Sequence, residues 1–361
     1  MVIMADDHMR EGDMTSFYTS LLLLLFTRLY PQVNSFVSLS DLKSESIVHE
    51  ELKSYDYYFL GETHDEDSLE AIQSKVISLI RGNATNFHYF FELPVDFNFA
   101  LEKIFVEDDT SMYTFNSFRV NKETMKLLKD LKTQNIKSIN SIDYIEKESF
   151  SENDILDYYF NKNVNNRQVN KDLQLVKKIN KTNFLFLNFY VHRFNKYKKA
   201  YERNILYHYE IIKKDTANVN LVINGIESYI NAMTENEIEP FKTKSRECFI
   251  LNSIIHFLKP EEKLISFNGH LHVPISTQNE WVDVKNWESL VAKMVKKYPK
   301  KKVCSIYLLK RTSDLVSEKY FPNEKKYILA NTKPGNIYFI KVADDTNLQE
   351  LKDKFQYMIV W

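Results

Sequence analysis

The stretch Tyr57-Tyr-Phe-Leu-Gly-Glu-Thr-His-Asp65 decides the fold expected for this chain. Its first four residues are apolar and typical of a buried β-strand, and the segment after them presents an acid and an imidazole, Glu62 and His64. A helical pattern over 69–81 follows. Ligands of open α/β sheets bind outside the carboxyl ends of the strands, so the sequence predicts a functional site at this point.

Two further predicted strands each close with an acidic residue. One covers Phe87–Leu93 and carries Glu92, and the other covers Ile136–Tyr144 and carries Asp143. Because a strand–helix–strand unit makes its two strands parallel, Glu62 and Glu92 are expected at the same edge of the sheet. A carboxylate at the end of an apolar strand is destabilising unless it has a partner or a function. We therefore interpret Glu92 as part of the site, with a capping or salt-bridge role as the alternative.

The whole pattern predicts one α/β domain, 36–361, with a mostly parallel central sheet flanked by helices on both faces. An Asn- and Lys-rich middle, 150–215, is predicted to be a helical insertion. Other helices are predicted over Leu42–Leu52, Lys122–Thr133, Lys244–Leu258 and Trp287–Lys297. Further strands are predicted over 219–223, 263–268, 303–310, 327–330, 337–342 and 357–361.

Residues 1–35 are predicted to be a signal or a disordered N-terminal segment. The apolar run Phe17–Phe26 is too short to span a bilayer, and it fits the h-region of a secretory signal if translation begins at Met14. A buried N-terminal helix is the alternative, since no basic region precedes the run. With a signal, the mature chain begins near Val33 and the protein is secreted, periplasmic or in the cell envelope; without one it is cytoplasmic. No other segment is apolar enough for a stable membrane span.

The charge balance argues against a nucleic-acid partner. The net charge is −1, from 48 basic and 49 acidic residues, and the two signs are interspersed rather than blocked. The two cysteines, Cys248 and Cys304, form no C-x-x-C motif and are expected to be buried thiols. A small-molecule or peptide substrate is the expected partner, and the oligomeric state is left open.

Two pairs of closely spaced residues contain the candidate catalytic or metal-binding groups. Glu62 and His64 are separated by one residue, as are His270 and His272. In an extended segment such pairs point to one face, so each can aim two groups at one point. Histidine oriented by a carboxylate is a natural general base near neutral pH, and the same inventory suits a divalent metal. The residue types alone do not distinguish a metal-free general base from a metal site. For His270 and His272, a surface turn that happens to contain two histidines remains the alternative.

The motifs and their order resemble the erythromycin esterase-like proteins. They are Leu60-Gly-Glu-Thr-His64, Glu92, Ser245-Arg-Glu247 at a helix start, and Phe267-Asn-Gly-His-Leu-His-Val273. The superfamily is thought to include ChaN-type haem-binding lipoproteins and the Tiki metalloproteases. The last motif departs from the esterase pattern, because Leu271 replaces an expected Asn and the histidines are closer together.

The resemblance implies a role for each matching residue. His64 would be the base that activates water, and Glu62 and Glu92 would orient it or bind substrate. His270 would complete the catalytic pocket. Arg246 would steady the acidic cluster or an anionic intermediate and, with His272, would bind substrate. Asp143 is predicted from its place at the third strand end, not from the resemblance, to bind substrate in the same pocket.

Three functions follow as hypotheses. The first is a hydrolase that uses His64 and the glutamates to attack an ester or amide. The second is a ChaN-like protein that binds haem or a divalent metal (Mn, Co or Zn) without catalysis. Its candidate metal ligands are Glu62, His64, His270 and His272. The third is a catalytically inactive interaction module, since fold does not fix function.

Overall fold

The computed structural model describes residues 35–63, 69–82, 84, 86–105, 122–133, 136–144, 216–235, 242–276, 287–312 and 315–361. The predicted insertion at 150–215 and residue His64 lie outside these ranges, as does all but the last residue of the predicted segment 1–35.

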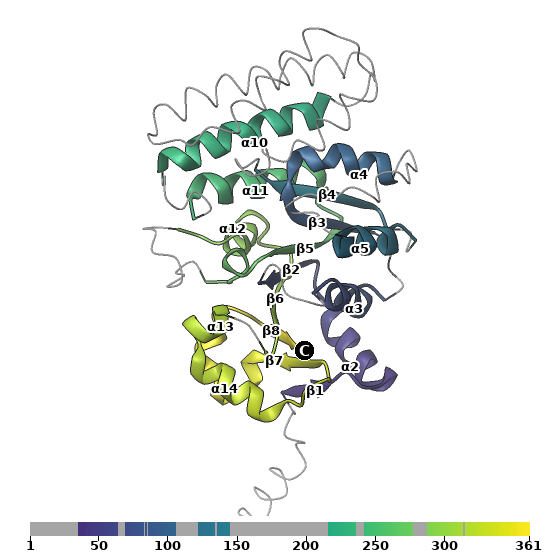
Figure 1. Ribbon diagram of the computed structural model, residues 1–361, viewed down its shortest axis with the longest axis vertical. Helices are drawn as coiled ribbons and strands as arrows, with labels where there is room; N and C mark the ends of the chain where they lie inside the picture. The colour runs from purple at the N-terminus through teal and green to yellow at the C-terminus, as the bar shows by residue number, and fades with distance from the viewer. Residues whose placement is uncertain are drawn as a thin grey trace, which may run out of the picture.

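Within the described residues, one eight-stranded sheet organises the chain (Figure 1). Its strands follow the order β1-β7-β8-β6-β2-β5-β3-β4. The neighbours from β8 to β4 pair in parallel, whereas β7 is antiparallel to β8 and to β1. The predicted α/β class with a mostly parallel sheet is therefore confirmed. The strands are β1 Phe36–Ser38, β2 Tyr57–Glu62, β3 Phe87–Pro94, β4 Ser138–Asp143, β5 Lys263–Gly269, β6 Val303–Leu309, β7 Tyr338–Lys341 and β8 Tyr357–Val360.

Strand β2 occupies the centre of the sheet because later strands pair with it on both sides. β5 pairs with one edge of β2 and β6 with the other. The strands β2 and β3 are parallel, as predicted, but they are not neighbours, since β5 lies between them. The carboxyl end of β2 is therefore flanked by the carboxyl ends of β5 and β6, which come about 200 and about 250 residues later in the sequence.

Helices cover both faces of the sheet (Figure 1). Tyr58 and Leu60 of β2 enter a core with residues of α2, α3, α4 and α5, whereas Tyr57 and Phe59 enter a core with residues of α11, α12 and α14. Burial on both faces explains why β2 has a continuous apolar run rather than an alternating one. The helices are α2 Leu42–Leu52, α3 Leu69–Arg81, α4 Asn98–Phe105, α5 Lys122–Thr133, α10 Thr216–Glu235, α11 Lys244–Phe257, α12 Leu290–Lys297, α13 Leu315–Tyr320 and α14 Pro322–Asn331.

Two predicted strands are wrong. The segment 219–223 lies inside α10, and the segment 327–330 lies inside α14. Both are short apolar runs, for which periodicity alone does not separate a strand from a buried helix. In the second case Pro322 begins the helix, and proline is well suited to the first helical turn. The prediction also missed the edge strand β1.

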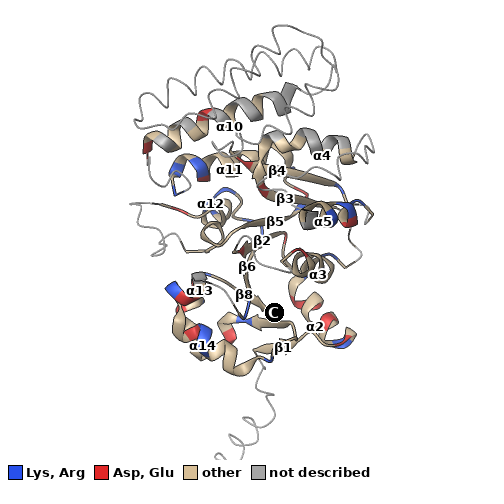
Figure 2. Cartoon of the chain, in the orientation of Figure 1, with Lys and Arg blue, Asp and Glu red and all other residues tan. Residues whose placement is uncertain are grey.

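The surface elements carry mixed charge, and both α13 and α14 contain Glu and Lys side chains (Figure 2). The prediction of two buried thiols is half right: Cys304 is buried on β6, but Cys248 is exposed on α11. Cys248 lies 3.8 Å from Nζ of Lys293, on α12, at a position that is exposed although the neighbouring Phe249 and Ile250 are buried. Among the described helices, none combines the length and the apolar character needed to cross a membrane.

Candidate functional site

Polar side chains converge at the carboxyl ends of β2, β3, β4 and β5. Glu62 ends β2, Glu92 lies near the end of β3, and Asp143 ends β4. All three are buried, with Asp143 fully so. The structure thus places the three acidic strand ends at one edge of the sheet. Buried carboxylates need partners, and the next residues supply them.

Arg246 joins two of these carboxylates. Its Nε and Nη2 donate to the two oxygens of Asp143 at 3.0 and 2.6 Å, and Nη2 also donates to Oε1 of Glu92 at 2.5 Å. The Tyr144 ring lies 5.2 Å from the guanidinium carbon. Burial alone would lower the pKa of Arg246, but Asp143 and Glu92 raise it well above its ordinary value. The planar guanidinium is suited to this bidentate pairing.

His272 lies between two carboxylates. Its Nε2 is 3.3 Å from Oε1 of Glu92, and its Nδ1 forms an ion pair with Oε1 of Glu247. Burial alone would lower the pKa of His272, but Glu247 and Glu92 raise it to about 10. The ring is therefore an imidazolium at neutral pH. In this state it donates hydrogen bonds and accepts no proton.

The first turn of α11 brings Arg246 and Glu247 to the site together. The Thr243 side chain caps the helix by accepting from the backbone N–H of Arg246 at 3.3 Å. At the end of α10, Glu235 accepts from the backbone N–H groups of Lys244 and Ser245. Such caps satisfy the free N–H groups of a helix start. They fix the direction in which the two following side chains leave α11.

Local backbone features hold Glu92 in place. Its Oε2 accepts from the backbone N–H of Gly269, at the end of β5. The pairing of β3 with β4 shifts between Phe91 and Pro94, which bracket Glu92. Where the strands separate, Asn98 bridges the gap through two hydrogen bonds to the backbone of Ser141, at 2.8 and 2.9 Å. Shifts of this kind redirect a side chain out of the regular ladder.

The second histidine pair is not extended, contrary to prediction. His270–His272 form a 3₁₀ helix, η3, directly after β5. With three residues per turn, positions i and i+2 do not share a face. His272 is accordingly buried in the cluster, while His270 is half-buried. The two imidazoles have separate environments and cannot act as one matched pair.

Gly61 allows η3 to pack on the end of β2. A Cβ atom at this position would overlap the side chain of Val273 and lie 3.4 Å from the Cα of His270. Next to it, Glu62 accepts a hydrogen bond from Nε2 of Gln73, on α3, at 2.5 Å. His64, two residues further on, lies outside the described residues.

The site therefore has two parts. We use the name buried ion cluster for the first, which consists of Glu92, Asp143, Arg246, Glu247 and His272. The second part is the rim, made by Glu62 and His270 at the ends of β2 and β5. Asp143 and Arg246 were predicted to bind substrate, yet the structure pairs them with each other in the buried part.

Sequence reasoning missed Glu247 and Gln73. Glu247 follows the predicted Arg246 directly, and an acid in the first turn of a helix is usually explained by the helix dipole. Gln73 stands beside the apolar residues Ile72 and Val76 of α3 and is buried with them. A buried amide within an apolar helix face was the available signal.

The described residues do not provide a ready metal site. Within them, no three His, Cys, Asp or Glu side chains are arranged to hold a metal ion. Both ring nitrogens of His272 already face carboxylates. His64 is a fourth candidate ligand and lies outside the described ranges, so the metal assignment stays a prediction.

Comparison with known proteins gives matches at the level of structure. No protein-family model matches the chain, and no curated protein matches its sequence. The crystal structure of a Bacillus cereus protein superposes with a TM-score of 0.59 at 13% identity, covering 89% of this chain and 92% of the other. A mutant of the erythromycin esterase EreC in its open conformation gives 0.59 at 10% identity, covering 89% and 93%. The haem-bound ChaN of Campylobacter jejuni gives 0.37 at 16% identity, covering 75% and 88%.

Proposed function

Because this chain has the erythromycin esterase-like α/β fold, we propose that it is a hydrolase in which His64 activates water for attack on an ester or amide bond. The observation that carries the proposal is the buried ion cluster at the carboxyl ends of the parallel strands, where α/β folds place their sites.

Within the proposal, the residues of the buried ion cluster are positioning residues. Glu92 accepts from Arg246 and from Gly269 and faces His272, so its oxygens are committed to the protein. His272 holds its proton and does not serve as the base. The proposal therefore assigns the general base to His64, which follows the rim residue Glu62 by two positions in the sequence.

The proposed step starts when His64 takes a proton from water. The water oxygen bonds to the carbonyl carbon, and the bond to the leaving alcohol or amine breaks as that group takes up a proton. A carboxylate near the base orients the imidazole and raises its basicity, and Glu62 is the candidate for this role. His270, half-buried beside the same strand ends, would contact the substrate.

The metal- or haem-binding alternative has weaker support from the residues described. A metal at His272 would have to displace either Glu92 or Glu247 from a ring nitrogen, since each nitrogen faces one of them. His272 is also only 3% exposed, which leaves no open nitrogen for an axial bond to haem iron.

The test is hydrolysis of activated esters such as p-nitrophenyl acetate. His64→Ala is expected to lower kcat/KM by about 100-fold or more, the usual contribution of a general base. Glu62→Gln should lower it less, with a shift of the pH profile. His256→Ala is the matched control, because His256 is exposed at the far end of α11.

Two outcomes would overturn the assignment. Hydrolysis that is unchanged in His64→Ala would exclude His64 as the base. A Soret band after addition of haem, lost in His64→Ala or His270→Ala and without esterase activity, would favour the binding protein.

A further inference from the structure

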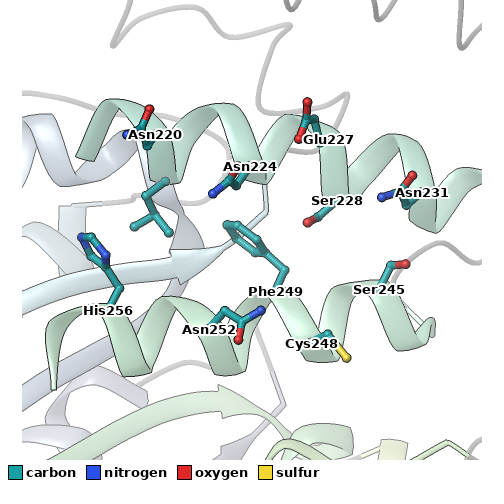
Figure 3. Close-up of a pocket in the computed structure, with 11 residues that line it drawn as sticks. Asn220, Asn224, Glu227, Ser228, Asn231, Ser245, Cys248, Phe249, Asn252 and His256 are labelled. Atoms are coloured by element: carbon teal, nitrogen blue, oxygen red, sulfur yellow. The ribbon is translucent and has the colours of Figure 1, made fainter. Parts of the chain in front are cut away.

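A cavity of about 700 Å³ lies between α10 and α11 (Figure 3). Figure 3 shows Asn224 and Ser228 projecting from α10 toward Phe249 of α11. We call it the α10–α11 groove. None of the described residues that line it belongs to the buried ion cluster or to the rim.

The accessible lining is polar and almost uncharged. It includes the four asparagines Asn220, Asn224, Asn231 and Asn252, all exposed. Their side chains make no hydrogen bond to another described residue. The described lining holds neither Lys nor Arg, and the apolar residues Leu221 and Phe249 are only 6% and 4% exposed. The groove therefore offers amide and hydroxyl groups over a buried apolar floor.

The polar residues form ladders along the two helices. Asn220, Asn224, Ser228 and Asn231 recur at spacings of three or four residues, which places them on one face of α10. Three helical turns make this ladder about 16 Å long. A ligand that uses its whole length has repeating polar groups and extends beyond a single ring. On α11 the corresponding row is Ser245, Cys248, Asn252 and His256. Because both ladders stand on helices, their spacing is fixed before a ligand binds.

The lining residues of the groove favour one chemical class of ligand over nucleic acids and peptides. Nucleic acids and other polyanions require Lys and Arg, which the described lining lacks. The common modes of peptide recognition require a strand edge, an apolar anchor pocket, an aromatic groove or an arginine cluster, and the described lining has none of these. An Asn side chain both donates and accepts hydrogen bonds, as does a sugar hydroxyl.

We propose that the α10–α11 groove binds a short neutral oligosaccharide. The amides of Asn224 and Asn252, on the facing helices, hydrogen-bond its hydroxyl groups. The cavity volume falls in the range of well-formed small-ligand sites. This binding is independent of the proposed hydrolytic step, because the groove and the rim share no described residue.

The experiment measures the binding of maltotriose, cellotriose and triacetylchitotriose to the full chain by saturation-transfer NMR and calorimetry. At least one trisaccharide is expected to bind saturably, with an affinity that does not fall as salt rises. Asn224→Leu and Asn252→Leu should each weaken it about tenfold, the loss of one or two hydrogen bonds. Asn323→Leu is the matched control, since Asn323 is an exposed asparagine on α14.

Thermal unfolding of each variant verifies that it is folded, and the two substitutions on different helices test the groove separately. Absence of saturable binding by all three trisaccharides overturns the proposal. Equal affinity in the two groove variants and the control also overturns it. A concentration-dependent dimer that both substitutions dissociate would instead make a second copy of the chain the occupant.

Discussion

Arg246 is the cation that pairs with both Asp143 and Glu92 while all three side chains are buried. Arg246→Met should lower the free energy of unfolding by about 3–5 kcal/mol, because it leaves buried carboxylates without their partner. Arg246→Lys should recover part of the loss, since lysine keeps the charge but not the bidentate geometry. Urea denaturation measures both.

Lys296→Met is the control for this prediction. Lys296 pairs with Glu288 on the surface, where an ion pair contributes about 1 kcal/mol or less. If Arg246→Met lowered the free energy of unfolding by only about 1 kcal/mol or less, the buried ion cluster would not depend on Arg246.

His272 makes stability depend on pH in a defined direction. Its pKa in the folded protein is about 10, against about 6.5 for an unperturbed histidine. A raised pKa contributes stability that is complete below the unfolded value and is lost as the pH rises through the folded value. The stability difference between wild type and His272→Gln should therefore be largest below about pH 6.5 and shrink toward pH 10.

Denaturation of the two proteins across this pH range gives the difference directly, and NMR of the ring protons gives the pKa itself. A ring that titrates near its ordinary value would mean that Glu92 and Glu247 do not hold the proton on His272.

At the scale of residues, the sequence located the acids better than it assigned their roles. Glu62, Glu92 and Asp143 could be placed at one edge because each closes an apolar strand. Which of them pairs with Arg246 depends on the directions of side chains from α11 and β3. Those directions are set by the caps at Thr243 and Glu235 and by the irregular pairing around Glu92.

Among the elements, β2 and η3 pack so closely that no side chain fits at Gly61 without displacing a neighbour. Gly61→Ala introduces a methyl group that overlaps Val273, which is fully buried. Overpacking of this kind typically costs about 1–3 kcal/mol, and here it would also displace His270 and His272. We expect a loss of stability together with a changed NMR environment of the His272 ring.

A double-mutant cycle with Val273→Ala separates this contact from general effects. The double variant Gly61→Ala/Val273→Ala should lose less unfolding free energy than the two single variants lose in sum. The reason is that the smaller side chain at position 273 makes room for the new methyl group. Strict additivity would contradict the packing of η3 on β2. Gly335→Ala is not a suitable control, since the positive φ of Gly335 adds a strain of its own.

Element identity was predictable where an apolar pattern extended over several helical turns. The helices α2, α3 and α5 have the predicted bounds, because apolar residues recur there at helical spacing. The segments 219–223 and 327–330 had only a short apolar run, and both belong to helices. The insertion of β5 between β2 and β3 is a contact between distant parts of the chain, which local patterns do not encode.

At the scale of the whole molecule, the predicted signal concerns residues outside the described ranges. We expect that the chain, expressed from its own amino terminus in a secretion-competent host, is cleaved near Val33 and exported. Intact mass spectrometry and N-terminal sequencing of the exported protein measure the cleavage. A cytoplasmic protein that keeps residues 14–32 would support the buried-helix alternative.

The sequence by itself determined the α/β class and the edge of the sheet that carries the candidate site. The reason is local: apolar runs bury the strands, and a polar residue at the end of such a run must meet a partner or a ligand. Only the tertiary structure decided that Gly61-Glu62 lies at the centre of the sheet, beside η3, and that His272 lies between Glu92 and Glu247. These facts depend on β5 and α11 reaching β2 and β3, and burial and charge pairing there result from the packed fold rather than from any one stretch of the chain.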